Sequence, residues 1–424
     1  MTKKDYTLPI AIIASLFFIF GFVTWINGSL IPFMKTINEL TESQSYLVAT
    51  ASYISFVVFA LPASYILTKI GYKRGMSLGL LTMGIGALIF IPAANSRTYW
   101  LFLLGIFTQG AGMTLLQTAS NPYITILGPI ESAARRISIM GIANKVAGAL
   151  GSIIFGALLL NGIEDVRKQL NSPGITDSVK NELLNNMANS VVLPYIIMAA
   201  ILFILAIGIL KAPLPDINNE SEDENDEKVS FWGIFKHPHL LLGALTLFFY
   251  VGAEVIAGDT IIAYGLALNI DEGIAQSFTA LTLLAMVVTY AFGVVLIPKY
   301  LSQSMALKIS ASLGILFSIA ILFTTGMTSI FFVASLGIAN ALVWPAVWPL
   351  ALDGLGKYTK IGSALLIMGI FGGAIIPPLY GNLVDKAISN NRELALASTE
   401  AYWILIPCYV FILFYAFYGH RIKK

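Results

Sequence analysis

Long runs without a single charged side chain recur along this chain of 424 residues, and they restrict it to one class of structure. A membrane-spanning helix needs about 20 apolar residues, so most runs hold one helix each. The run Ile309–Leu352 is long enough for two helices, folded back at Thr324–Ser329. The runs are Tyr6–Met34, Ser43–Thr68, Gly75–Ser96, Thr98–Ile130, Leu183–Leu210, Gly273–Pro298, Ile309–Leu352, Ile361–Val384 and Ala401–His420.

Two further stretches, Arg136–Ile163 and Leu240–Ile270, are apolar but contain ionisable residues. Together with the charge-free runs they predict twelve transmembrane helices and therefore an all-α membrane protein. Charged residues make up only 11% of the chain, well below the roughly 25% of soluble domains. The first run lacks a basic segment before it and a cleavage site after it, so we expect a retained helix rather than a cleaved signal.

The basic residues are distributed unevenly between alternate loops. With the N-terminus placed in the cytoplasm, most Lys and Arg side chains fall in cytoplasmic loops, as they do in membrane proteins generally. We therefore expect a multi-pass protein of a bacterial inner (plasma) membrane with both termini in the cytoplasm. The single cysteine, Cys408, excludes an intrachain disulfide.

An acidic, polar segment near residues 213–228 interrupts the apolar pattern in the middle of the chain. Such a composition is typical of a solvated, flexible tether. We expect an N-terminal six-helix bundle over 1–211, a cytoplasmic linker over 212–239 and a C-terminal six-helix bundle over 240–424.

The two halves also resemble one another. Several short stretches match at nearly one offset, which aligns Gln117 with Trp344 and Asn121 with Trp348. Internal repeats of this kind are typical of transporters, so we expect two pseudo-symmetric bundles.

Three ionisable residues lie in the middle of apolar stretches: Lys145, Glu254 and Asp259. A charge at membrane depth is costly, so such residues usually face a watery cavity or one another and mark a substrate or ion path. On a regular helix Glu254 and Asp259 would not share a face, unless the flanking Gly252 and Gly258 break the helix. The sequence leaves open which carboxylate pairs with Lys145. A structural pair that locks two helices is the alternative to a role in ion coupling.

Amide and indole side chains recur at membrane depth on predicted helices. They are Asn27, Gln117, Asn121, Asn144, Asn340, Trp344 and Trp348. Gln117 and Asn121 are four residues apart and share one helix face, and the stripe that begins at Asn340 matches it in the second half. Sugar hydroxyls pair with amides, while the C–H face of a sugar ring packs on an indole. The alternative is that the amides hydrogen-bond between helices and only stabilise their packing.

Motifs of enzymes are absent from the sequence. It contains no G-x-x-x-x-G-K-[ST] phosphate loop, no H-E-x-x-H and no G-x-S-x-G. We therefore expect a protein that is not an enzyme and that uses no cofactor other than a coupling ion.

Four stretches carry a resemblance to a known family. They are Asn27-Gly-Ser-Leu-Ile-Pro32, Gln117-Thr-Ala-Ser-Asn-Pro-Tyr-Ile-Thr-Ile-Leu-Gly-Pro129, Tyr250-Val-Gly-Ala-Glu-Val255 and Gly372-Gly-Ala-Ile-Ile-Pro377. They resemble the fucose–galactose–glucose permease branch of the major facilitator superfamily. The segment Trp344–Gly356 is similar to bacterial members that take up glucose, galactose or N-acetylglucosamine. The resemblance implies transport of a neutral hexose of the glucose, galactose, mannose or N-acetylglucosamine type by alternating access.

The chain departs from this family at two carboxylates. Family members commonly have an Asp where this chain has Gly28, and the proton-coupled fucose permease has a Glu where this chain has Gln117. Glu254 and Asp259 remain, and an ionised Asp259 beside the hydroxyl of Thr260 would suit a hard cation. We therefore expect a sodium-coupled symporter with a sodium ion at Asp259. Proton-coupled symport and uncoupled uniport are the alternatives.

The expected partners follow from this interpretation. They are a small-molecule sugar and the lipid bilayer, with no nucleic acid, and we expect a monomer. A membrane sensor that binds sugar without transporting it is an alternative from a different class of function, and an exporter of amphiphilic compounds fits the polar amides less well.

Overall fold

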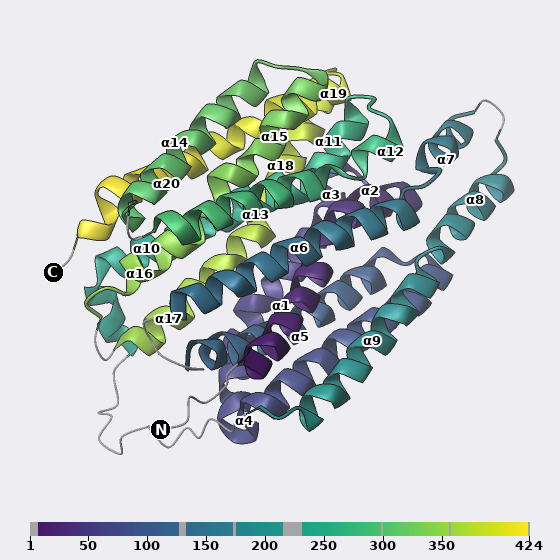
Figure 1. Ribbon diagram of the computed structural model, residues 1–424. Helices are drawn as coiled ribbons and strands as arrows, with labels where there is room; N and C mark the ends of the chain where they lie inside the picture. The colour runs from purple at the N-terminus through teal and green to yellow at the C-terminus, as the bar shows by residue number, and fades with distance from the viewer. Residues whose placement is uncertain are drawn as a thin grey trace.

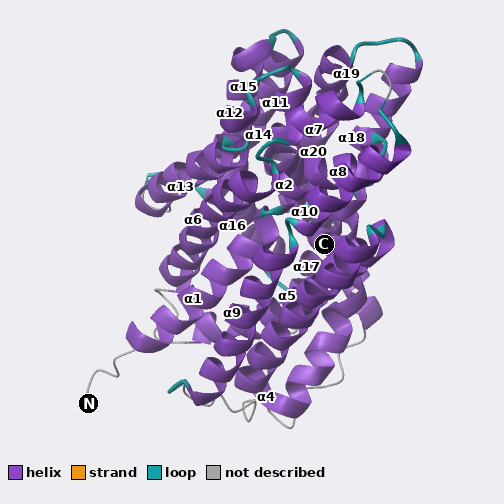
Figure 2. Ribbon diagram, turned by 90° about the vertical axis from the view of Figure 1, so that its right-hand side faces the viewer, coloured by secondary structure: helices purple, strands orange, loops and turns teal. Residues whose placement is uncertain are grey.

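Helices and their connections make up the described part of this computed structural model, which covers residues 7–126, 133–172, 175–214, 231–297, 300–355 and 358–422. Within these ranges there is no strand, as Figure 2 shows. This part contains 11 helices long and apolar enough to cross a membrane, and a shorter apolar helix, Leu47–Ala60. The predicted all-α architecture with twelve membrane helices is confirmed.

The first half of the chain contains the helices α1 (Thr7–Trp25), α2 (Asn27–Ile37), α3 (Glu42–Ser45), α4 (Leu47–Ser96), α5 (Tyr99–Ile126), α6 (Ala133–Leu159), α7 (Ile163–Leu170), α8 (Asp177–Asn189) and α9 (Val192–Lys211). α1 and α2 form one span, and α8 continues into α9. α4 holds two spans, because its backbone turns at Gly71, whose φ of 77° lies in the left-handed region that glycine adopts without strain.

The second half contains η3 (Phe231–Lys236), α10 (Pro238–Val255), η4 (Ile256–Thr260), α11 (Ile261–Ala267), α12 (Glu272–Ala275), α13 (Phe278–Leu296), α14 (Gln303–Leu322), α15 (Gly326–Ala341), α16 (Val343–Leu352), α17 (Thr359–Met368), η6 (Gly369–Phe371), α18 (Gly372–Ser389), α19 (Leu394–Ala401), η7 (Tyr402–Ile404), α20 (Leu405–Phe417) and η8 (Gly419–Arg421). η4 is a π-helical turn between α10 and α11. Most of the predicted linker lies outside the described residues.

The two halves lie side by side, with the first half, purple through teal, toward the lower right of Figure 1 and the second half, green to yellow, toward the upper left. At their boundary α6 packs along α13, and α3 and α4 pack against α18. The first described helix begins and the last one ends at the end of the molecule opposite the hairpin of α7 and α8. We call this end the termini end. We call the opposite end, where α3 lies with the hairpin of α7 and α8, the α3 end.

Large apolar side chains cover the outer surfaces of both bundles. Leu193, Ile204, Phe292, Val295 and Phe323 are all exposed. Exposed apolar surface on this scale marks contact with a membrane rather than water. Lys145, Glu254 and Asp259, by contrast, lie inside the molecule.

Candidate functional site

A buried ion pair joins the two halves. Lys145 on α6 places its Nζ 2.9 Å from Oε1 of Glu254 on α10, and the two side chains are only 10% and 11% exposed. The sequence left two carboxylates open as partners of this lysine, and the structure pairs it with Glu254. A salt bridge so shielded from solvent holds both charges only because each neutralises the other.

The indole of Trp25 lies against this pair, at the end of α1. The Lys145 ammonium lies 4.2 Å from the centroid of the Trp25 ring, which is the geometry of a cation–π contact. Glycines make room for the ring, since a Cβ at Gly148 would lie 2.4 Å from its Cδ1 and one at Gly258 would lie 2.3 Å from its Cζ3. Trp25 thus touches α6 of one half and η4 of the other. Sequence reasoning missed it, although it lies at membrane depth two residues before Asn27.

A row of aromatic rings continues from the ion pair into the second half. Tyr250 lies one turn before Glu254 and interacts electrostatically with that carboxylate. The rings of Tyr250 and Trp344 lie 6.4 Å apart between centroids, and Trp344 stacks on Trp348 at 5.3 Å. Both predicted tryptophans are half-buried. They therefore form a preassembled aromatic surface, stacked on one another in this state.

The predicted amides occupy different environments. Asn144 donates from Nδ2 to the carbonyl of Phe17 at 3.4 Å, whereas the Nδ2 of Asn27, on a residue only 3% exposed, has no hydrogen-bond partner in the described structure. Gln117 is half-buried on α5. The side chain of Asn121 lies outside the described residues.

Asn340 is set apart from the two tryptophans. The expected single stripe is interrupted, because α15 ends at Ala341 and α16 begins at Val343. Asn340 is fully buried and its Oδ1 accepts a hydrogen bond of 2.9 Å from the Tyr409 hydroxyl, while its Nδ2 has no partner in the described structure. This amide therefore bonds inside the second half, to a side chain of α20.

Asp259 lies in the π-helical turn η4, five residues after Glu254. It is completely buried, and among the described residues neither carboxylate oxygen has a hydrogen-bond partner. The sequence left open whether the flanking glycines break the helix. The segment widens into a π-turn, which places Asp259 within electrostatic reach of Glu254 and Lys145. π-turns inside α-helices occur frequently at functional sites.

The sodium ligand expected beside Asp259 is engaged elsewhere. The Thr260 hydroxyl donates to the carbonyl of Ile256 at 2.8 Å and lies 2.8 Å from the Tyr402 hydroxyl. These contacts do not test the sodium site at Asp259, which stays a prediction.

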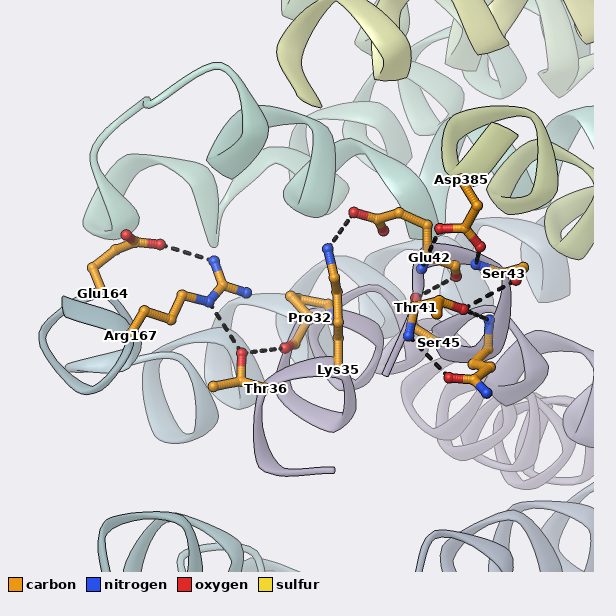
Figure 3. A network of polar contacts seen from close by, with 11 residues as sticks. Pro32, Lys35, Thr36, Thr41, Glu42, Ser43, Ser45, Glu164, Arg167 and Asp385 are labelled. Carbon is orange, nitrogen blue, oxygen red and sulfur yellow. Dashed lines mark hydrogen bonds and ion pairs between the residues drawn. The ribbon is translucent and has the colours of Figure 1, made fainter. Parts of the chain in front are cut away.

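A polar network joins the halves at the α3 end, and Figure 3 shows it. Asp385 on α18 accepts the backbone N–H groups of Glu42 and Ser43, each at 2.9 Å, at the start of α3. The Thr41 side chain caps the same helix, and Lys35 pairs with Glu42. Because helix N-termini favour negative charge, Asp385 fixes the second half to the first.

A second carboxylate repeats this arrangement nearby. Glu272 on α12 accepts the backbone N–H groups of Gly162 and Glu164 at the start of α7. A cavity of about 50 Å³ lies between α2, α7 and α11, with Lys35 and Arg167 in its lining, and it has room for a water or two but not for a sugar. The α3 end is therefore closed in this state. Sequence reasoning missed both carboxylates.

Chemically, the boundary offers a charged pair, the free amide donor of Asn27 and a tryptophan surface. These groups suit a neutral molecule that presents several hydroxyl groups and an apolar face. Within the described residues no cluster of three or more His, Cys, Asp and Glu side chains could hold a metal ion.

Comparisons with known proteins agree with this arrangement. The family model described as Major Facilitator Superfamily matches residues 13–378. The glucose/galactose transporter of Brucella abortus biovar 1 (strain 9-941) is 32% identical over 429 residues, which cover 99% of this chain and 96% of that protein. The L-fucose-proton symporter of Escherichia coli (strain K12) is 28% identical over 396 residues, covering 91% and 89% of the two chains.

Among solved structures, the chain is similar to a Major Facilitator Superfamily transporter, FucP, in the outward conformation. The TM-score is 0.73 at 25% sequence identity, and the match covers 98% of this chain and 99% of that one. The twelve-helix arrangement is thus shared over nearly the full length of both chains.

Proposed function

The chain belongs to the major facilitator superfamily, in its fucose–galactose–glucose permease branch, and we propose that it carries a neutral hexose across a bacterial plasma membrane by alternating access. Its family consists of transporters rather than enzymes. Glucose and galactose are the first candidates, because they are what the Brucella relative is named for. Mannose and N-acetylglucosamine are the next sugars of the same type to test.

The observation that carries this proposal is the Lys145–Glu254 pair at membrane depth between the halves. Its free donors and acceptors would bind sugar hydroxyls through charge-assisted hydrogen bonds, which are about twice as strong as neutral ones. Trp344 and Trp348 would carry the C–H face of the ring, and Asn27 would supply a further amide donor.

In an alternating-access transporter the two ends of the molecule face opposite sides of the membrane. We assign the α3 end to the outside and the termini end to the cytoplasm, because Lys69, Lys73 and Arg74 in the turn between the two spans of α4 lie on the termini side. The network of Figure 3 then closes the outer side.

The test is counterflow in proteoliposomes that contain the purified full-length chain. Vesicles loaded with unlabelled D-glucose should take up labelled D-glucose transiently, and D-galactose, D-mannose and N-acetylglucosamine should compete with it. L-glucose and protein-free vesicles are the controls. Binding of a hexose without counterflow would favour the non-transporting sensor, and no binding of any hexose would contradict the proposal.

A further inference from the structure

The Asp259 carboxylate is the one charge of the central cluster that has neither a counter-ion nor a hydrogen bond among the described residues. It is fully buried, both oxygens lack partners, and the nearby Lys145 is engaged by Glu254. An ionised carboxylate is very costly to bury in this way, whereas a neutral carboxylic acid costs far less. The surroundings of Asp259 are therefore those of a protonated side chain.

The π-turn that holds Asp259 uses its hydroxyl neighbours to support the backbone. Thr279 donates to the carbonyl of Gly258 at 2.6 Å, and Thr282 donates to that of Ala257 at 3.2 Å. These carbonyls belong to the widened turn, and hydroxyls of α13 satisfy them. A hard cation would need several oxygen ligands gathered around it, and neither Asp259 oxygen has a hydrogen-bonding side chain beside it among the described residues. A proton needs no such shell.

Asp259 also lies where the two halves meet. Gly28 of α2 packs on the turn so closely that a Cβ there would lie 2.6 Å from Oγ1 of Thr279, 3.2 Å from the carbonyl oxygen of Gly258 and 3.5 Å from Cα of Asp259. The network of Figure 3 closes the α3 end. Separation of the halves at that end would expose Asp259 to water. A group that carries protons from one side of the membrane to the other must be exposed in this way.

We propose that Asp259 is the proton-carrying group of this transporter. It binds one proton at a carboxylate oxygen while the α3 end is open, and it releases that proton to water while the termini end is open. With Lys145 and Glu254 cancelling each other, a protonated Asp259 leaves the cluster neutral, which favours closure around it. The inference rests on the proposed sugar transport and specifies its driving ion.

Other titratable groups near Asp259 do not account for such coupling. Those that interact with it electrostatically are Glu254, Lys145, Tyr46 and Tyr53. The first two hold each other, and phenols stay protonated throughout the physiological pH range. α2, α13, α15 and α18 also pack against η4. Of their charged groups, Lys35 pairs with Glu42 and Asp385 binds the start of α3.

The experiment is sugar accumulation in proteoliposomes with labelled D-glucose and D-galactose. A gradient of about one pH unit, alkaline inside, supports about tenfold accumulation if one proton accompanies each sugar. The wild type should reach this level under the proton gradient and not under a sodium gradient alone. Asp259→Asn should lose accumulation while counterflow remains measurable, because exchange needs only the sugar site. Asp259→Glu, which keeps a carboxyl group, should keep part of the accumulation.

The matched control is Asp177→Asn, which changes an exposed carboxylate on α8 and should behave as wild type. Full proton-driven accumulation by Asp259→Asn would overturn the inference. So would accumulation that only sodium drives, in which case Asp259 or another group holds sodium. Absence of counterflow in the wild type would reject the proposed function itself, so the two failures are distinguishable. Sugar-dependent proton uptake by the wild type, measured in weak buffer, tests the proton without any variant, and its absence would also overturn the inference.

Discussion

Neutralising the Lys145–Glu254 pair one charge at a time and then both together separates a structural role from a binding role. Lys145→Met and Glu254→Gln each leave one buried charge without its partner. The double variant removes both charges and keeps side chains of similar size. The three variants thus form a double-mutant cycle, which measures the coupling between the two residues directly.

The structure sets the expected magnitudes. The atoms are 2.9 Å apart and the side chains are 10% and 11% exposed, so little water screens the charges. Breaking such a pair from one side costs about 3–5 kcal/mol, because the other charge stays buried and unpaired. Lys145→Met also loses the contact with Trp25, worth about 1 kcal/mol. The double variant should recover most of the loss, since apolar or neutral replacement of a whole buried pair is often nearly neutral.

The assay is the free energy of unfolding in mixed micelles, followed as SDS is increased, together with counterflow of D-glucose. A coupling energy of about 5 kcal/mol or more is expected, because each single variant should lose about 3–5 kcal/mol and the double variant little. The exposed pair of Lys168 and Asp165, 3.9 Å apart on α7, is the matched control, and its cycle should give at most about 0.5 kcal/mol. Counterflow should stay impaired in the double variant, because sugar hydroxyls would lose their charged partners.

Two results would refute this reasoning. If the double variant loses as much stability as the two single variants added together, Lys145 and Glu254 do not stabilise each other. If the double variant regains its stability and also shows full counterflow, the pair only holds α6 against α10 and does not bind sugar.

Three further changes test the remaining parts of the site. Gln117→Ala should weaken hexose binding by about tenfold, because an unpaired hydroxyl costs roughly 1–3 kcal/mol, and unchanged affinity would mean that Gln117 only packs. Trp344→Ala should abolish counterflow while Trp344→Phe keeps part of it; counterflow in the Ala variant would exclude this ring as the platform. Asp385→Ala should loosen the α3 end, so a Ser45→Cys reporter, buried in the intact protein, should react several-fold faster with an impermeant maleimide. Unchanged labelling would mean that Asp385 does not hold the end closed.

The spanning helices could be predicted from sequence because the bilayer imposes one rule on every segment. Each backbone polar group must be satisfied within the helix, so length and apolarity suffice to find it. The same rule made Lys145, Glu254 and Asp259 conspicuous, because charges are rare at that depth. Their spacing in sequence could not show which carboxylate Lys145 meets, since the pairing depends on how α6 docks against α10.

The contacts at the α3 end carry a weaker signal in the sequence. Asp385 and Glu272 bind backbone N–H groups of the opposite half, and such partners have no recognisable side-chain pattern. One part was predictable, because Thr41 and Gln44 form a capping box that marks the start of α3. The π-turn at Asp259 was foreseeable only as an irregularity near Gly258, since its stabilisation comes from hydroxyls of α13.

Trp25 provides a physical link between the proposed sugar site and the proposed proton site. Its ring lies under the Lys145 ammonium and against Gly258, the residue next to Asp259. A sugar that draws Lys145 or Glu254 toward its hydroxyls would disturb the cation–π contact and shift the ring against the turn. The field at Asp259 would change as well, because Lys145 and Glu254 act on it with opposite signs. Sugar binding and proton release would then be coupled through contacts that both halves share. Each event would need the two halves to move relative to one another.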